Sequence, residues 1–277
     1  MRIPQPLARL VARAKPAVPA TLWPLLLTMR SFPGGGPIVG VPGFRRVLVL
    51  APHPDDETIG CGGTVALLGA AGADVTVVFA TDGEATRGSP DGARATGARR
   101  REEAAQAAAI LGAATRFLGL ADGGLGAAVE SDGLRDGALT AAIAAAVEAV
   151  APEVVFAPWP LDGHPDHAAV AEALALVTAR YGRPAGRLLA HAEVWGYETR
   201  TALVPNRLVD VSTVIDAKRA ALAAHATGSL AFDLEAGIGL NRWRSVHGLM
   251  GRGYAEAFLA VPADDYAYLN RMVQERS

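Results

Sequence analysis

The sequence predicts an α/β fold, a Rossmann-like and mostly parallel twisted sheet with helices on both faces and a functional site at the carboxyl ends of the strands. Three observations predict it. From residue 45 onward, short apolar runs alternate with alanine-rich stretches of helical length, which is typical of repeated strand–helix–strand units. The apolar runs are rich in valine, as in strands that are buried on both faces. Histidine and aspartate follow directly after two of these runs, where ligands bind in open α/β sheets.

The order of the elements follows from the apolar periodicity. We expect strands at residues 46–51, 74–80, 116–120, 154–158, 188–195 and 208–211. We expect helices at residues 60–71, 99–111, 134–150 and 167–181. Gly112 is a natural residue to end the second of these helices. Residues 232–245 show no single period, so we predict an irregular cap near the site there.

The composition is that of a folded chain with a large core. Hydrophobic residues make up 51% of the 277 residues and charged residues 19%, which excludes a disordered chain. The net charge of −2 at pH 7 argues against nucleic acid as a partner. Cys61 is the single cysteine, so an intrachain disulfide and a cysteine-based zinc cluster are excluded, and a cytoplasmic location is expected.

We predict one domain over residues 45–277, preceded by an N-terminal extension and linker at residues 1–44. The sequence has no run of about 18 apolar residues, so no transmembrane segment is predicted. Residues 22–29 are apolar, but the run is short and includes Pro24. Two alternatives stand for the extension. It is packed on or loosely attached to the domain, or it forms a helix that makes peripheral contact with a membrane surface.

Two strings of polar residues carry the predicted chemistry. The first predicted strand runs into His53-Pro54-Asp55-Asp56-Glu57, and the strand at 154–158 is followed by Asp162-Gly163-His164-Pro165-Asp166-His167. Because parallel strands end at the same edge of a sheet, we expect the two strings to converge. Three successive carboxylates repel one another unless a cation or hydrogen-bond donors compensate.

A set of imidazole and carboxylate ligands suits a Zn²⁺ cofactor in a catalytic arrangement, where three protein ligands leave one position open for water. His53 and Asp56, three positions apart on a turn, can face one ion, while Asp55 between them faces the water. His167, at the start of a helix, supplies the third ligand. An N-cap aspartate or a loop histidine is common without any metal, so the prediction depends on both strings together.

The two strings resemble those of a known family, the PIG-L/LmbE-like zinc deacetylases. The resemblance rests on Ala51-Pro52-His53-Pro54-Asp55-Asp56-Glu57 and His164-Pro165-Asp166-His167, and it extends to Thr81-Asp82-Gly83-Glu84, Arg100-x-x-Glu103 and Asp122-Gly123. These motifs match in order and spacing over about residues 46–175. Further on, Lys218 and His225 look like the distal part of the family, but Thr227-Gly228 stands where the family has Ser-Gln.

The resemblance implies hydrolysis of an N-acyl group, typically acetyl, on a small molecule or glycoconjugate that contains N-acetylglucosamine. It implies that His53, Asp56 and His167 hold Zn²⁺. It also implies that Asp55 is the general base and that His164 stabilises the oxyanion or donates a proton. The expectation of hydrolysis also follows from the predicted metal alone. Zinc lowers the pKa of its bound water to roughly 7 and polarises an amide carbonyl.

Three further residues each have a functional and an ordinary interpretation. Asp166 can orient His164 through its second ring nitrogen, or it can cap a helix. The resemblance places Arg100 against the substrate, where we expect its loss mainly to raise KM, whereas Arg100 could instead pair with Glu103 on the helix surface. Asp122 would accept hydrogen bonds from sugar hydroxyls, or it is part of an ordinary Asp-Gly turn.

Two other function classes remain open. Gly60-Cys61-Gly62-Gly63, with Asp82 after the next strand, is a weak match to a dinucleotide-binding fingerprint. Two histidines and one carboxylate also describe the ligand set of non-haem iron enzymes. Bound metal would separate the nucleotide-binding interpretation from the other two. Release of acetate from an N-acetylglucosaminide would then separate hydrolysis from iron chemistry.

Overall fold

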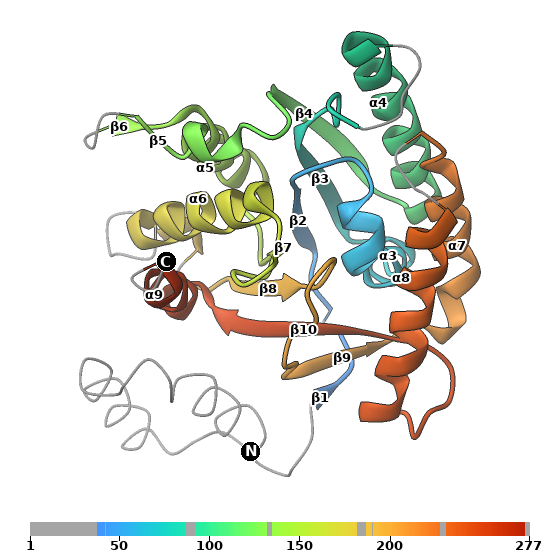
Figure 1. Ribbon diagram of the computed structural model, residues 1–277. Helices are drawn as coiled ribbons and strands as arrows, with labels where there is room; N and C mark the ends of the chain where they lie inside the picture. Colours follow the sequence, from blue (N-terminus) through green and yellow to red (C-terminus); the bar gives the residue numbers. More distant parts are fainter. Residues whose placement is uncertain are drawn as a thin grey trace, which may run out of the picture.

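A computed structural model describes residues 38–41, 43–86, 92–131, 135–181, 187–189, 191–227 and 231–274. Its centre is an eight-stranded sheet in the order β1-β9-β10-β8-β7-β2-β3-β4 (Figure 1). The strands are β1 Ile38–Val39, β2 Arg46–Ala51, β3 Asp74–Thr81, β4 Ala114–Leu120, β7 Val154–Pro158, β8 Glu193–Tyr197, β9 Arg207–Asp210 and β10 Ala255–Pro262. Every neighbouring pair is parallel except the two that involve β10. The predicted fold class, a mostly parallel sheet in an α/β fold, is confirmed.

Strands β2, β3 and β7 form the buried middle of the sheet. In register, Val49 on β2 lies beside Val77 on β3 and Phe156 on β7, and all three side chains are fully buried. Branched and aromatic side chains suit this environment because both faces of each strand are covered. The carboxyl ends of β2 and β7 therefore lie next to each other, which determines where the site is.

Helices cover both faces of the sheet (Figure 1). One face carries α3 Asp56–Ala70, α4 Gly92–Leu111, α7 Ile215–Ala224 and α8 Ala231–Arg244, and the other carries α5 Ala138–Val150, α6 Pro165–Tyr181 and α9 Ala263–Gln274. Each face has its own cluster of buried apolar side chains, and the sheet separates the two clusters. A short hairpin, β5 Glu130–Ser131 with β6 Arg135–Asp136, precedes α5.

The chain enters the sheet through β1, which lies within the segment predicted as extension and linker. β1 pairs with β9, and Phe44 packs edge-on against Trp195 with 5.8 Å between ring centroids. The rest of that segment, including residues 22–29, lies outside the described residues. Among the described residues, no helix is long and apolar enough to cross a membrane.

The structure corrects several predicted elements. The irregular cap predicted for residues 232–245 is wrong, because this stretch is the helix α8. Its two glycines, Gly237 and Gly239, hide the apolar period. The strand predicted from 188 begins only at Glu193, since residues 187–189 form a 3₁₀ turn. β10 and α9 were not predicted.

Helix α3 is broken at Cys61, whose φ and ψ of −144° and 15° are not helical. A buried ion pair occupies the break: Lys218 Nζ lies 2.6 Å from Glu256 Oε1 and donates to the carbonyl of Ile59 at 2.8 Å. Glu256 accepts from the backbone N–H groups of Gly63 and Thr64 at 2.8 and 2.7 Å. The backbone groups released by the break are thus satisfied by side chains from α7 and β10.

Candidate metal and catalytic site

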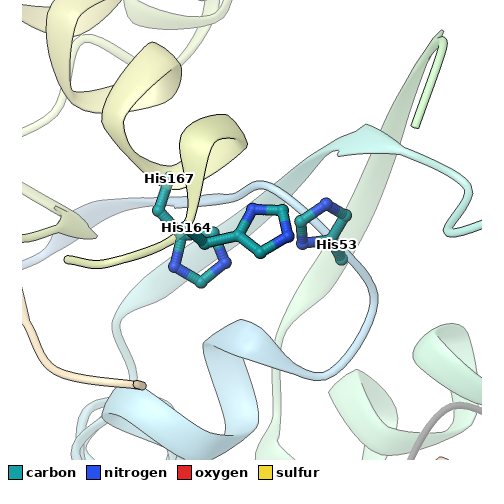
Figure 2. Close-up of side chains that lie close together, drawn as sticks. All are labelled: His53, His164 and His167. Atoms are coloured by element: carbon teal, nitrogen blue, oxygen red, sulfur yellow. The ribbon is translucent and has the colours of Figure 1, made fainter. Parts of the chain in front are cut away.

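The two predicted strings converge at the carboxyl edge of the sheet. His53 lies in the loop between β2 and α3, and His164 and His167 lie at the start of α6 (Figure 2). The ring centroid of His164 is 4.9 Å from that of His53 and 4.9 Å from that of His167. One ligand atom from each of the three imidazoles lies within 4.8 Å of the others. This is the spacing of groups that could share a metal ion.

Asp56 lies between two of these imidazoles. Its Oδ2 is 3.1 Å from His53 Nδ1 and 3.2 Å from His167 Nε2. The contact between His167 Nε2 and Asp56 is at ion-pair distance but lacks hydrogen-bond geometry, so this buried nitrogen has no hydrogen-bond partner among the described residues. Buried polar atoms normally have a hydrogen-bond partner, so we expect a ligand to bind this nitrogen. A divalent metal fits the donor set, because neutral imidazole nitrogens and a carboxylate oxygen are its usual ligands.

Further carboxylates bind the remaining ring nitrogens. Asp162 Oδ1 is 3.0 Å from His167 Nδ1, which also lies 3.1 Å from the Thr199 hydroxyl. Asp122 Oδ1 and Asp166 Oδ2 are each 3.1 Å from His53 Nε2. Carboxylates in this position fix the tautomer and the orientation of metal-binding histidines. No pattern in the sequence pointed to Thr199, which comes from the loop after β8, and no role was predicted for Asp162.

The carboxylates make the site strongly attractive to positive charge. Burial disfavours the charged imidazolium of His53, but Asp122, Asp166 and Asp56 outweigh it and raise the pKa of His53 to about 12. Burial likewise opposes the charged form of His167, but Asp56 and Asp162 outweigh it, so the pKa of His167 rises to about 9. The raised pKa values favour protonated imidazoles beside the carboxylates when no metal is bound. A divalent cation would displace those protons.

Asp55 is partly exposed beside these groups and has an unusual backbone, with φ 121° and ψ −30°. Its Oδ2 accepts from Arg100 Nη2 at 3.1 Å. Burial and the negative charge of Asp56 raise the pKa of the Asp55 carboxyl to about 7, against the opposing effect of Arg100. A carboxylate with a pKa near neutrality is suited to accept and return a proton.

His164 is partly exposed and accepts a hydrogen bond at Nδ1 from the backbone N–H of Asp166, at 3.2 Å. In the neutral ring this assigns the proton to Nε2, which can then donate to a ligand. Burial and the charges on His167 and His53 lower the pKa of His164. Asp166 thus orients His164 through its amide, while its carboxylate contacts His53 and accepts from the N–H groups of Gly123 and Leu125.

Arg100 is buried and does not pair with Glu103, so the surface-pair alternative is wrong. Its guanidinium donates to the carbonyls of Pro54 and Gly83, to Asp55 and to the Thr86 hydroxyl. Glu103 accepts from Thr227 instead. Asp122, for which sugar contacts were predicted, lies against His53 and accepts from the N–H of Ala85.

The glycine string that imitates a dinucleotide-binding fingerprint serves helix packing. Gly60 to Gly63 lie inside α3 and are buried. A Cβ at Gly60 would collide with the ring of Tyr197, and one at Gly63 with Val211. The absence of side chains therefore brings α3 close to the sheet, and this use of the glycines is an alternative to phosphate binding.

Comparisons with known proteins agree with this geometry. A family model described as GlcNAc-PI de-N-acetylase (PIG-L) matches residues 48–178. The 1D-myo-inositol 2-acetamido-2-deoxy-alpha-D-glucopyranoside deacetylase of Kineococcus radiotolerans is 32% identical over 288 residues, which cover 76% of this chain and 80% of that protein. The diacetylchitobiose deacetylase of Thermococcus kodakarensis is 33% identical over 129 residues, 44% of this chain and only 45% of that protein.

Among solved structures, a conserved protein of Thermus thermophilus superposes with a TM-score of 0.65 at 30% identity, and the match covers 79% of this chain and 96% of that one. The relatives named above are deacetylases of compounds that contain N-acetylglucosamine. Sequence identity, coverage and fold lead to the same conclusion: this chain belongs to the PIG-L family of LmbE-like deacetylases.

Proposed function

We propose that this protein is a zinc-dependent N-deacetylase that removes an acetyl group from a small molecule or glycoconjugate containing N-acetylglucosamine. The observation that carries the proposal is the convergence of His53 Nδ1 and His167 Nε2 on one carboxylate oxygen of Asp56, at 3.1 and 3.2 Å, with Asp55 and His164 beside them. The relatives that are deacetylases of such sugars support the substrate class.

His53, Asp56 and His167 would hold the zinc ion, which when bound would lower the pKa of water and polarise the acetamide carbonyl. Asp55 would take a proton from the attacking water as its oxygen bonds to the carbonyl carbon. Asp55 would then give this proton to the amide nitrogen as the C–N bond breaks, so that acetic acid, which ionises to acetate, and a neutral amine leave. The pKa of Asp55, raised to about 7, suits both transfers.

His164 would stabilise the negative charge that develops on the carbonyl oxygen. Its Nδ1 accepts from the amide of Asp166, so its Nε2–H is available to donate. Asp166 and Asp122 would hold His53 in the tautomer that presents Nδ1 to the metal.

Arg100 is proposed to have two roles. Its five N–H donors already face four acceptors, among them Asp55 and the carbonyl of Pro54. This supports a role in holding the general base in addition to the predicted contact with substrate hydroxyls or phosphate. For Asp122, which is 12% exposed at its side chain, a contact with a sugar hydroxyl stays part of the proposal.

A screen of deacetylation tests the proposal. The purified protein would be analysed for metal and assayed for acetate release from four classes of N-acetylated substrate: a glycolipid head group, a pseudo-disaccharide thiol precursor, chito-oligosaccharides and a glycosylated natural product. We expect about one zinc ion per chain and release of acetate in at least one class. His53→Ala, Asp56→Ala and His167→Ala should each lower zinc content and turnover together.

Full zinc content in the His167→Ala protein would contradict the ligand assignment. Iron with no acetate release from any class would favour the non-haem iron alternative. His247→Ala, a change at an exposed histidine outside the site, is the matched control and should keep both zinc and activity.

A further inference from the structure

The backbone at Asp55 is strained. Its φ of 121° lies in the range that favours glycine, beyond the left-handed region near +57° that L-residues tolerate. Only Ala151 and Met250 share a positive φ among the described non-glycine residues, at 45° and 52°. A residue in such a conformation is energetically costly and persists only where its surroundings enforce it. The contacts that enforce this conformation also set the position of the Asp55 side chain, which is the proposed general base.

The carboxylate of Glu57 is the group that binds the Asp55 amide. Glu57 Oε2 accepts from the backbone N–H of Asp55 at 3.1 Å, two residues upstream. The side chain of Glu57 is completely buried. A buried carboxylate that accepts from a backbone N–H fixes the position of that N–H closely, since leaving either group without its partner is costly.

The other carboxylate oxygen is bound by a residue far away in the sequence. Glu57 Oε1 lies 3.1 Å from Nε2 of His225, which follows the last residue of α7, and accepts from the Thr58 hydroxyl. His225 is 1% exposed. It supplies the donor that a buried carboxylate requires, so the orientation of Glu57 depends on the packing of α7 against α3.

We propose that Glu57 is a positioning residue for the general base: held by His225, its carboxylate clamps the Asp55 amide and maintains the strained turn that presents the Asp55 side chain to the reaction. This inference rests on the proposed function. Arg100 restrains the same turn through other groups than Glu57 does. Whereas Glu57 accepts from the Asp55 N–H, Arg100 donates to the carbonyl of Pro54 and to the carboxylate of Asp55. Without Glu57 the turn would relax toward an ordinary φ, and Asp55 would move away from its proton donor.

The test compares Glu57→Ala, Glu57→Gln and the wild type. Glu57→Ala should lower kcat about 10- to 100-fold while KM stays within about threefold and zinc content is unchanged, because a misplaced base impairs the chemical step and leaves ground-state binding intact. Glu57→Gln keeps an oxygen that can accept from the Asp55 N–H, so it should recover most of the lost turnover. Amide hydrogen exchange over residues 53–58 should accelerate in Glu57→Ala and change little in Glu57→Gln.

Glu103→Ala is the matched control. Glu103 is also a buried carboxylate that accepts from a distant backbone N–H, that of Thr227, and its partner lies outside the 53–57 loop. Its loss should lower thermal stability without lowering kcat. In the Asp55→Asn background, Glu57→Ala should have no further effect on turnover, since a residue that acts only through Asp55 has nothing left to position.

Three outcomes would overturn the clamp: an unchanged kcat in Glu57→Ala, a loss of zinc in Glu57→Gln, or a full additional loss of turnover in the double variant. Failure of the proposed function is distinguishable from each of these, because it would show as absence of acetate release by the wild type. If Glu57→Ala does not fold, Glu57→Gln and His225→Gln still test the proposal. Weakening the contact between His225 and Glu57 should accelerate hydrogen exchange over residues 53–58 in His225→Gln, while Glu57→Gln changes little and both variants keep their zinc. Hydrogen exchange in His225→Gln equal to that of the wild type would contradict the role of His225 in holding Glu57.

Discussion

At the residue scale, Asp55 combines three properties: a pKa raised to about 7, a strained backbone and a direct contact with Arg100. Burial and the charge of Asp56 disfavour its ionised form, while Arg100 keeps that form accessible. A group balanced in this way can take up and release a proton within one catalytic cycle. Asp56, one residue along, differs because His167 and His53 outweigh burial and hold its pKa well below the usual range.

Asp55→Asn should keep the metal and lose turnover. The amide cannot accept the proton of the attacking water, and general acid–base catalysis contributes roughly 10²- to 10⁴-fold, so kcat should fall by about that factor. Zinc content should match the wild type, since His53, Asp56 and His167 are unchanged. Steady-state kinetics with metal analysis checks this. Turnover within about a factor of ten of the wild type would transfer the base role to His164.

Arg100→Ala should affect both kinetic constants. Loss of the proposed substrate contact would raise KM, and loss of the donors to Asp55 and Pro54 would lower kcat. Arg100→Lys should recover only part of either, because one ammonium group cannot reach four acceptors that the guanidinium binds in a planar fork. Kinetics of both variants on the best substrate measure the two effects. If only KM changes, Arg100 does not restrain the base.

At the element scale, the broken helix α3 connects the site to distant parts of the chain. The first turn of α3 carries Asp56 and Glu57, and the break at Cys61 changes its direction. Lys218 and Glu256 satisfy the backbone on both sides of the break, and both side chains are fully buried. The angle between the two parts of α3, and thus the position of the 53–57 loop, depends on this ion pair.

Lys218→Met should destabilise the protein by roughly 3–5 kcal/mol, because it leaves the buried carboxylate of Glu256 without its counter-charge and the carbonyl of Ile59 without a donor. Urea unfolding of the metal-free variant and wild type measures this. The control is Arg101→Met, which removes a partly exposed partner of Asp82 and should cost at most ~1 kcal/mol. Equal losses in the two variants would show that the ion pair does not stabilise the break.

The elements show where sequence patterns are informative. The strands β2, β3 and β7 could be predicted because their valine-rich runs reflect burial on both faces. The sequence pattern does not predict α8, because Gly237 and Gly239 obscure its apolar period. The two histidine and aspartate strings were brought together as expected, since parallel strands end at one edge. The Glu57–His225 contact could not be foreseen, because it depends on how α7 packs on α3.

At the scale of the whole molecule, the site joins the two halves of the fold. His53 and Asp56 lie just before and at the start of α3, which covers one face of the sheet. His164 and His167 lie at the start of α6, which covers the other face. A metal held by both groups would connect the two faces through the carboxyl edge. Metal binding should therefore raise global stability, and the size of the effect should depend on the protonation of the ligands.

That dependence has a definite sign. The pKa values of His53 and His167 are raised from 6.5 to about 12 and about 9, so without metal the folded state binds more protons than the unfolded state above pH 6.5. The stabilisation from these protons is complete below pH 6.5 and falls as the pH rises, up to about pH 9 for His167 and about pH 12 for His53. Zinc needs the neutral imidazoles, so the stabilisation from zinc should grow over the same interval.

The expected result is a Tm of the chelator-treated protein that falls between pH 6.5 and 9 while the difference in Tm between the zinc-loaded and chelated protein increases. Thermal unfolding at several pH values within this interval, at constant ionic strength, measures both. His167→Ala should flatten both trends, because it removes a histidine with a raised pKa that is also a proposed metal ligand. His247→Ala, at an exposed position outside the site, should leave both trends unchanged. A zinc effect on Tm that shrinks as the pH rises would contradict the assignment of His53 and His167 as ligands, since ligands that must lose a proton bind zinc more tightly as the pH rises.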